Sequence, residues 1–111
     1  MDPVYVLAVF NLECAWEGLP PTYRIYVDNE LFTERTWDYV GFDSVEVLQI
    51  IAPPGKYVVR LESVPPNLAA FHWSDHRITK GSAHWHTPQR SKSGFIKEAV
   101  LEISPCEPEN L

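Results

Sequence analysis

Apolar and polar residues alternate with a period of two along most of the chain, and no window repeats at the spacing of a helix. In the run TYRIYVD, Tyr23, Ile25 and Val27 share one face, and the residues between them point to the other. The runs SVEVLQIIA and KYVVRLESV alternate in the same way. This period predicts β-strands that each bury one side.

Turn-forming residues divide these runs into short strands. The ten prolines include pairs at 20–21, 53–54 and 65–66, and a proline cannot donate to a sheet ladder. Asp28-Asn29 can supply the tight turn of a hairpin. The runs LAAFHW, DHRITK and SAHWH are predicted as separate strands, divided at Ser74-Asp75 and at Gly81. The chain is therefore predicted to be all-β, an antiparallel β-sandwich of jelly-roll type with about eight strands.

The length of 111 residues fits a single domain over residues 1–111, with a loosely held tail from about residue 104 to residue 111. The first strand is predicted over roughly residues 4 to 16, and its opening half is apolar on both faces, as in a central strand covered on each side. The apolar run at 4–10 is far shorter than the roughly 20 residues of a membrane span, and Met1-Asp2-Pro3 has no basic region of a secretion signal. We expect no signal peptide, no transmembrane segment and no membrane partner.

The formal net charge of −6 is unevenly distributed along the chain. Residues 1–75 carry eleven acids against four bases, whereas residues 76–97 carry five bases and no acid. This asymmetry favours self-association or an acidic protein partner, and no motif supports a nucleic-acid partner. The predicted basic contact region consists of Arg77, Lys80, Arg90 and Lys92.

All four histidines lie in the stretch FHWSDHRITKGSAHWH at residues 71–86. His84 and His86 are two apart in a predicted strand and therefore project from the same face, where they could chelate a transition metal. His72 and His76 could complete the ligand set if the two strands pair.

The favoured interpretation of the same stretch is an ordinary hairpin. Its imidazoles would lie at the surface, while Trp73 and Trp85 fill the core from the other face. We therefore expect no cofactor, and metal binding by the histidines is kept as the third functional hypothesis.

The sequence favours a protein that is not an enzyme. Its serines lack the Gly-x-Ser-x-Gly turn, and its five glycines lie singly at turns rather than in a phosphate-binding loop. Cys14 lies in an apolar strand, which should raise the pKa of its thiol and make it unreactive. Cys14 and Cys106 lie near opposite ends of the chain, and without an export signal two reduced thiols are favoured over a disulfide.

A second functional hypothesis is carbohydrate binding. Trp37 and Tyr39 lie in the predicted loop TWDYVGFD, where their rings could stack on a sugar. Asp38 and Asp43 beside them would accept hydrogen bonds from sugar hydroxyls. The competing interpretation is that these aromatic rings fill the core. On this hypothesis the partner is a polysaccharide.

Three longer runs carry a resemblance to known proteins: YRIYVDNELFTERTW, PGKYVVRLESV and AFHWSDHRITKGSA, which fall within residues 22–83. Their order resembles that of small jelly-roll proteins associated with the virions of tailed phages, including phages of cyanobacteria, and more distantly that of carbohydrate-binding modules. The resemblance implies a structural role in capsid decoration or in a tail, with contacts to further copies or to shell and tail proteins. It also implies synthesis in the host cytoplasm and a final location in the virion.

Overall fold

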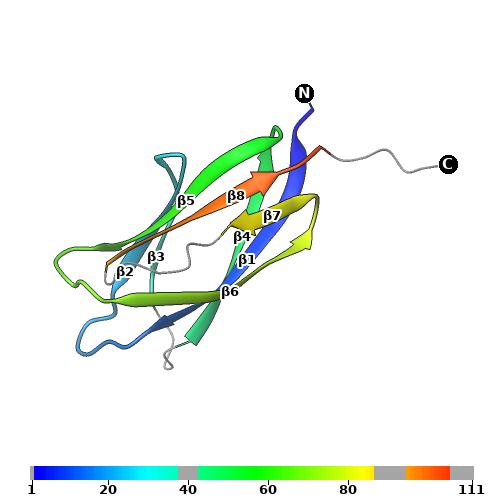
Figure 1. Ribbon diagram of the computed structural model, residues 1–111. Helices are drawn as coiled ribbons and strands as arrows, with labels where there is room; N and C mark the ends of the chain where they lie inside the picture. The colour runs from blue at the N-terminus through cyan, green and yellow to red at the C-terminus, as the bar shows by residue number, and fades with distance from the viewer. Residues whose placement is uncertain (1, 38–42, 87–94, 106–111) are drawn as a thin grey trace.

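Eight strands form two antiparallel sheets that pack face to face in the computed structural model, which describes residues 2–37, 43–86 and 95–105 (Figure 1). Sheet A has three strands, in the order β4 (Asp43–Ala52), β1 (Val4–Cys14), β6 (Phe71–Lys80). Sheet B has five, in the order β3 (Glu30–Thr36), β2 (Thr22–Val27), β5 (Gly55–Val64), β8 (Ile96–Ile103), β7 (Ala83–His86). The predicted antiparallel β-sandwich of about eight strands is confirmed.

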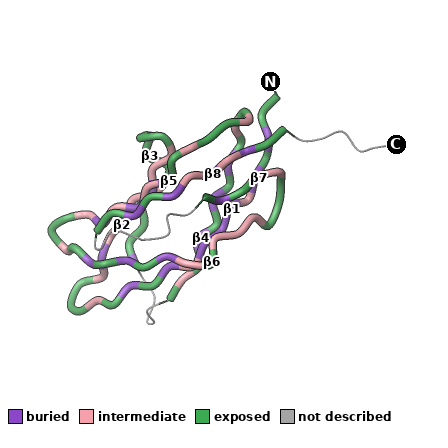
Figure 2. Tube along the Cα trace, in the orientation of Figure 1, coloured by how far each residue is buried: buried purple, intermediate pink, exposed green. Residues whose placement is uncertain are grey.

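One core lies between the sheets, because each strand turns one set of alternating side chains inward. Phe10 and Leu12 of β1 face Ile25 of β2 and Leu61 of β5, and all four are fully buried. Burying a side chain of this size contributes about 1.5–3 kcal/mol. The outward sides of the strands are largely exposed (Figure 2). The alternation in the sequence therefore identified most of the core.

The hairpin between β2 and β3 turns at Asp28-Asn29, as predicted. Both residues have positive φ, 50° and 67°, which is the backbone of a type I′ turn. The backbone amide of Val58 donates to Asp28 Oδ1 at 2.7 Å, and Arg60 Nη1 donates to Asn29 Oδ1 at 2.7 Å. The turn is thus fastened to the neighbouring strand β5.

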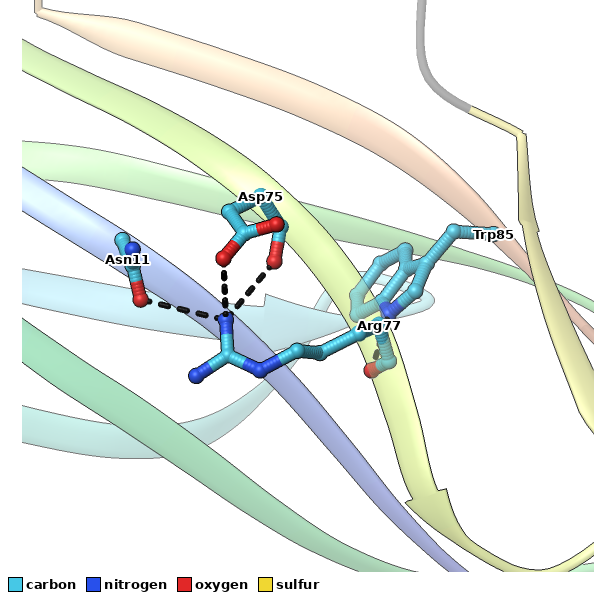
Figure 3. A network of polar contacts seen from close by, with 4 residues as sticks. All are labelled: Asn11, Asp75, Arg77 and Trp85. Atoms are coloured by element: carbon cyan, nitrogen blue, oxygen red, sulfur yellow. Dashed lines mark hydrogen bonds and ion pairs between the residues drawn. The ribbon is translucent and has the colours of Figure 1, made fainter.

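The predicted break at Ser74-Asp75 is wrong, because β6 runs through it. At this point β6 has an extra residue against β1, with a register shift between Val9 and Asn11, and Asp75 takes a positive φ of 54°. Arg77 Nη1 donates to Asp75 O at 2.9 Å, to Asp75 Oδ2 at 3.1 Å and to Asn11 Oδ1 at 3.1 Å (Figure 3). Arg77 therefore bridges a β-bulge that continues the strand.

The first strand ends at Cys14 rather than near residue 16, and it is central in its sheet but not covered on both sides. Its outward residue Val9 is buried by the neighbouring strands, whereas Tyr5, on the same face, is exposed. The outer face of sheet A is therefore a surface of the molecule.

The chain passes from sheet A to sheet B at Gly81, between β6 and β7. Gly81 has a φ of +92°, and a Cβ at this position would lie 2.2 Å from the backbone oxygen of Tyr5. Trp85, just beyond the crossing, donates from Nε1 to the backbone oxygen of Arg77 at 3.0 Å (Figure 3). On this side of the sandwich, the backbone at Gly81 therefore packs directly against the backbone of Tyr5, which only glycine permits.

We expect Gly81→Ala to lower the free energy of unfolding by about 3 kcal/mol or more, because both the positive φ and the contact with Tyr5 O must be relieved. Gly18→Ala is the matched control, since Gly18 also has a positive φ of +77° but a Cβ there meets nothing within 4 Å. It should cost about 1 kcal/mol. Urea unfolding followed by tryptophan fluorescence measures both values, and equal losses would contradict the close packing at Gly81.

Candidate functional site

The edge strands β3 and β4 border an open side of the sandwich, here called the seam. Among the residues that the structure describes, two hollows lie between these strands, with volumes of about 500 Å³ and 350 Å³. The first is lined by Tyr23, Glu34, Arg35, Thr36, Trp37, Val45, Glu46 and Val47. The second is lined by Val27, Asp28, Glu30, Leu31, Phe32, Gln49, Ile50, Ile51, Ala52 and Tyr57.

A buried carboxylate links the two sheets in the first hollow. Glu46 of β4 points inward and is only 3% exposed. The hydroxyl of Tyr23 donates to Glu46 Oε1, and Arg35 Nε of β3 donates to Glu46 Oε2 at 3.0 Å. Both donors come from sheet B, whereas the acceptor belongs to sheet A. The charge of Glu46 is therefore compensated inside the seam, as a buried charge requires.

The second hollow has an apolar rim. Leu31 and Phe32 of β3 are exposed on one side, and Ile51 of β4 is 65% exposed on the other. Val45 and Val47 continue the exposed apolar row along β4. Contiguous exposed apolar side chains are typical of surfaces that bind other molecules. The seam is therefore the candidate functional site.

The pattern of the sequence predicts no site at this surface. Its signal is the run SVEVLQIIA, in which both faces of the strand are apolar and the single charge is Glu46. In the structure Glu46 points inward. The outward side chains between the ends of β4 are therefore all uncharged, which the sequence alone does not show.

The predicted basic contact region is described in part. Arg77 lies on β6 and is paired with Asp75, and Lys80 Nζ lies 5.4 Å from the centre of the Tyr5 ring. Lys97, a further base of the same segment, is only 5% exposed and belongs to the interior of sheet B. A contact role for the region stays a prediction. Arg90 and Lys92 lie outside the described residues.

The predicted metal site does not form from the four histidines. His72 and His76 belong to β6 in sheet A, whereas His84 and His86 belong to β7 in sheet B, and these two strands do not pair. His86 Nε2 instead lies 2.8 Å from Glu102 Oε1 of β8. Over residues 2–37, 43–86 and 95–105, no group of three or more histidine, cysteine or acidic side chains could hold a metal ion.

The prediction of a sugar platform at Trp37 is also wrong. Trp37 is 1% exposed, and its ring packs near those of Tyr23 and Phe71, with centroids 6.4 and 6.3 Å away. The side chain fills the core at the end of β3. Asp43 is exposed at the start of β4. Asp38 and Tyr39 lie outside the described residues.

His76 is held in an aromatic pocket between the sheets. Its ring lies 5.4 Å from Phe10, 4.8 Å from Trp73 and 5.0 Å from Trp85, measured between centroids. The two tryptophans are buried, as predicted. His76 Nε2 is buried without a hydrogen-bond partner. Burial lowers the pKa of His76 to about 4, although the charge of Asp75 opposes this shift.

Cys14 is a buried free thiol at the end of β1. Burial raises its pKa to about 11, so the thiolate is scarce at neutral pH. The predicted burial of Cys14 in an apolar strand is confirmed, and its pKa is raised as expected. Two reduced thiols in place of a disulfide stay a prediction. Cys106 lies outside the described residues.

The described geometry thus defines an all-β sandwich with an open, apolar-rimmed seam. No family model matches the chain, and no curated protein or solved structure matches it. In the part of the chain that the structure describes, no helix has the length and apolar character needed to cross a bilayer. The resemblance to phage virion proteins therefore stays a prediction.

We expect stability to fall as the pH drops from about 6.5 to about 4, because of His76. In this interval the unfolded chain protonates the imidazole while the folded chain keeps it neutral, so protons favour unfolding. Because the ring is only partly buried, solvent screening should hold the loss from this residue to about 1–2 kcal/mol, below the roughly 3 kcal/mol of the unscreened shift. Urea unfolding at a series of pH values measures it.

His76→Leu removes the titrating group from the pocket and should make the pH dependence in this interval shallower than in the unmodified protein. His72→Gln is the matched control, since His72 lies on the same strand but is exposed. It should leave the slope unchanged. A slope that survives in His76→Leu would contradict the assignment to His76.

Proposed function

We propose that the chain is a non-enzymatic structural protein that acts through protein–protein contacts, as a capsid-decorating or tail component of a phage virion. The observation that carries the proposal is the row of apolar side chains along the seam. Ile51 of β4 is exposed at the second hollow, which Leu31 and Phe32 of β3 also line. Val45 and Val47 are exposed beside the first hollow. Such a row gains free energy when another surface covers it.

Polar side chains near the seam serve the fold. Glu46 is held by Tyr23 and Arg35, and Arg24 is paired with Glu34 at 2.5 Å on the outer side of the hairpin. These contacts fix the positions of β3 and β4 relative to their neighbours. A firmly held edge presents its apolar side chains at a low entropic cost of association, which favours a binding role.

The resemblance supports the same role. The run YRIYVDNELFTERTW forms the β2–β3 hairpin and includes the whole of β3, one border of the seam. PGKYVVRLESV begins just before β5, and AFHWSDHRITKGSA contains β6. The segments that resemble virion-associated proteins therefore contribute to both sheets. The location in a virion, after synthesis in the host cytoplasm, is part of the proposal.

We do not propose carbohydrate binding as a second function. Trp37, the ring on which the platform depended, is in the core, where it packs near Tyr23 and Phe71.

Mass spectrometry of purified particles of the encoding phage tests the proposal. We expect peptides of the chain at a fixed ratio to the major shell protein, unchanged through successive density gradients, because a virion component is bound stoichiometrically. Host proteins in the same fractions are the control for contamination. A chain whose amount falls with each gradient, as these host proteins do, would not be a virion component.

A further inference from the structure

The two sheets have four edge strands in the described part of the chain, and three of them carry features that hinder pairing with another strand. The register of β3 is shifted against β2, and Glu30, Glu34 and Arg35 lie along it. The register of β6 is shifted twice against β1. The third of these edges, β7, has only four residues. Bulges, charges and short length are the usual protection of sheet edges.

The remaining edge, β4, is long and regular, and its only charges are Asp43 at one end and the inward-facing Glu46. It is ten residues long and pairs with β1 over ten positions without a register shift. The outward side chains between its ends are Val45, Val47, Gln49 and Ile51, all uncharged and exposed. Its inward charge, Glu46, is compensated by Arg35. A regular edge whose outward side chains are uncharged between its ends is suited to main-chain hydrogen bonding with a further strand.

We infer that β4 pairs with β4 of a second copy of this chain, antiparallel and about a two-fold axis, so that two copies of sheet A form one continuous six-stranded sheet. The inference deepens the proposed function and rests on it, because it names the partner that covers the seam side of β4.

The charges at the ends of β4 select this arrangement. Asp43 lies opposite Glu13 of β1, and both are exposed, so one end of the edge is acidic. The other end lies near Tyr5, which carries Lys80 over its ring. A parallel pair would place the two acidic ends together. An antiparallel pair centred near Leu48 separates the two Asp43 residues by roughly 34 Å. Each Asp43 then lies toward the end of the other copy at which Lys80 of β6 reaches over Tyr5 of β1.

The side chains also match under this symmetry. With Leu48 opposite Leu48, Val45 of one copy lies opposite Ile51 of the other, and Val47 lies opposite Gln49. The outward row then continues across the new sheet without a charge between its ends. Because the dimer has a two-fold axis, each of these side-chain pairs occurs twice in the interface, as in any isologous interface. A different partner whose strand carried acidic side chains would place them opposite Val45, Val47 and Ile51, and these pairs of uncharged side chains would be lost.

Analytical ultracentrifugation of the full chain over a range of concentrations tests the inference. We expect a monomer–dimer equilibrium with a dissociation constant on the order of micromolar, because an interface of this kind is small. Val47→Lys places a like charge in both copies at the centre of the interface and should weaken association by at least about tenfold. Ile51→Lys changes a more exposed position and should weaken association in the same way. It still tests the interface if Val47→Lys does not fold.

Val58→Lys is the matched control, because Val58 is 39% exposed on the outer face of β5, an interior strand of sheet B. It should leave the dimer intact. A chain that stays monomeric up to about 1 mM would overturn the inference. So would a dimer that neither Val47→Lys nor Ile51→Lys weakens, or one that Val58→Lys dissociates.

The two proposals fail separately. A chain that is present in virions but monomeric in solution would overturn the β4 pairing and leave the virion role standing. A chain that dimerises through β4 but is missing from purified particles would overturn the virion role and leave the pairing standing.

Discussion

One core has to be covered by a sheet of three strands and a sheet of five, and this unequal width governs the rest of the structure. On one side the chain itself crosses from β6 to β7 at Gly81, and the buried Trp85 just beyond the crossing donates to the backbone oxygen of Arg77 in β6. On the other side the edges of β3 and β4 are joined across the seam by the pair of Arg35 and Glu46. One side is thus closed by backbone and aromatic packing, whereas the other leaves two hollows and an exposed apolar row.

Much of this fold could be predicted from the sequence, because period two and turn chemistry are local. The hairpin at Asp28-Asn29 follows from residues that tolerate positive φ, and the burial of Trp73 and Trp85 follows from alternation. The continuity of β6 could not be predicted, since the bulge at Asp75 depends on Arg77 reaching back across it to β1. Local pattern also does not say which sheet a strand joins.

That last limit explains the errors in the candidate sites. The histidines appeared as one cluster because they are close in sequence, but the crossing at Gly81 places His84 and His86 in the other sheet, and the bulge turns His76 into the core. The seam was missed for the same reason. Its two borders come from different sheets, and the inward direction of Glu46 becomes visible only with Arg35 and Tyr23 in place.

Amide hydrogen exchange, followed by nuclear magnetic resonance on dilute monomer, tests the open seam most directly. If β4 is a free edge, its backbone amides should fall into two alternating classes, with slow exchange where the N–H points to β1 and fast exchange where it points to the seam. The amides of β1, which pairs on both sides, should all be slow. Uniformly slow exchange along β4 would show that the edge is already covered within one chain, and would contradict the account.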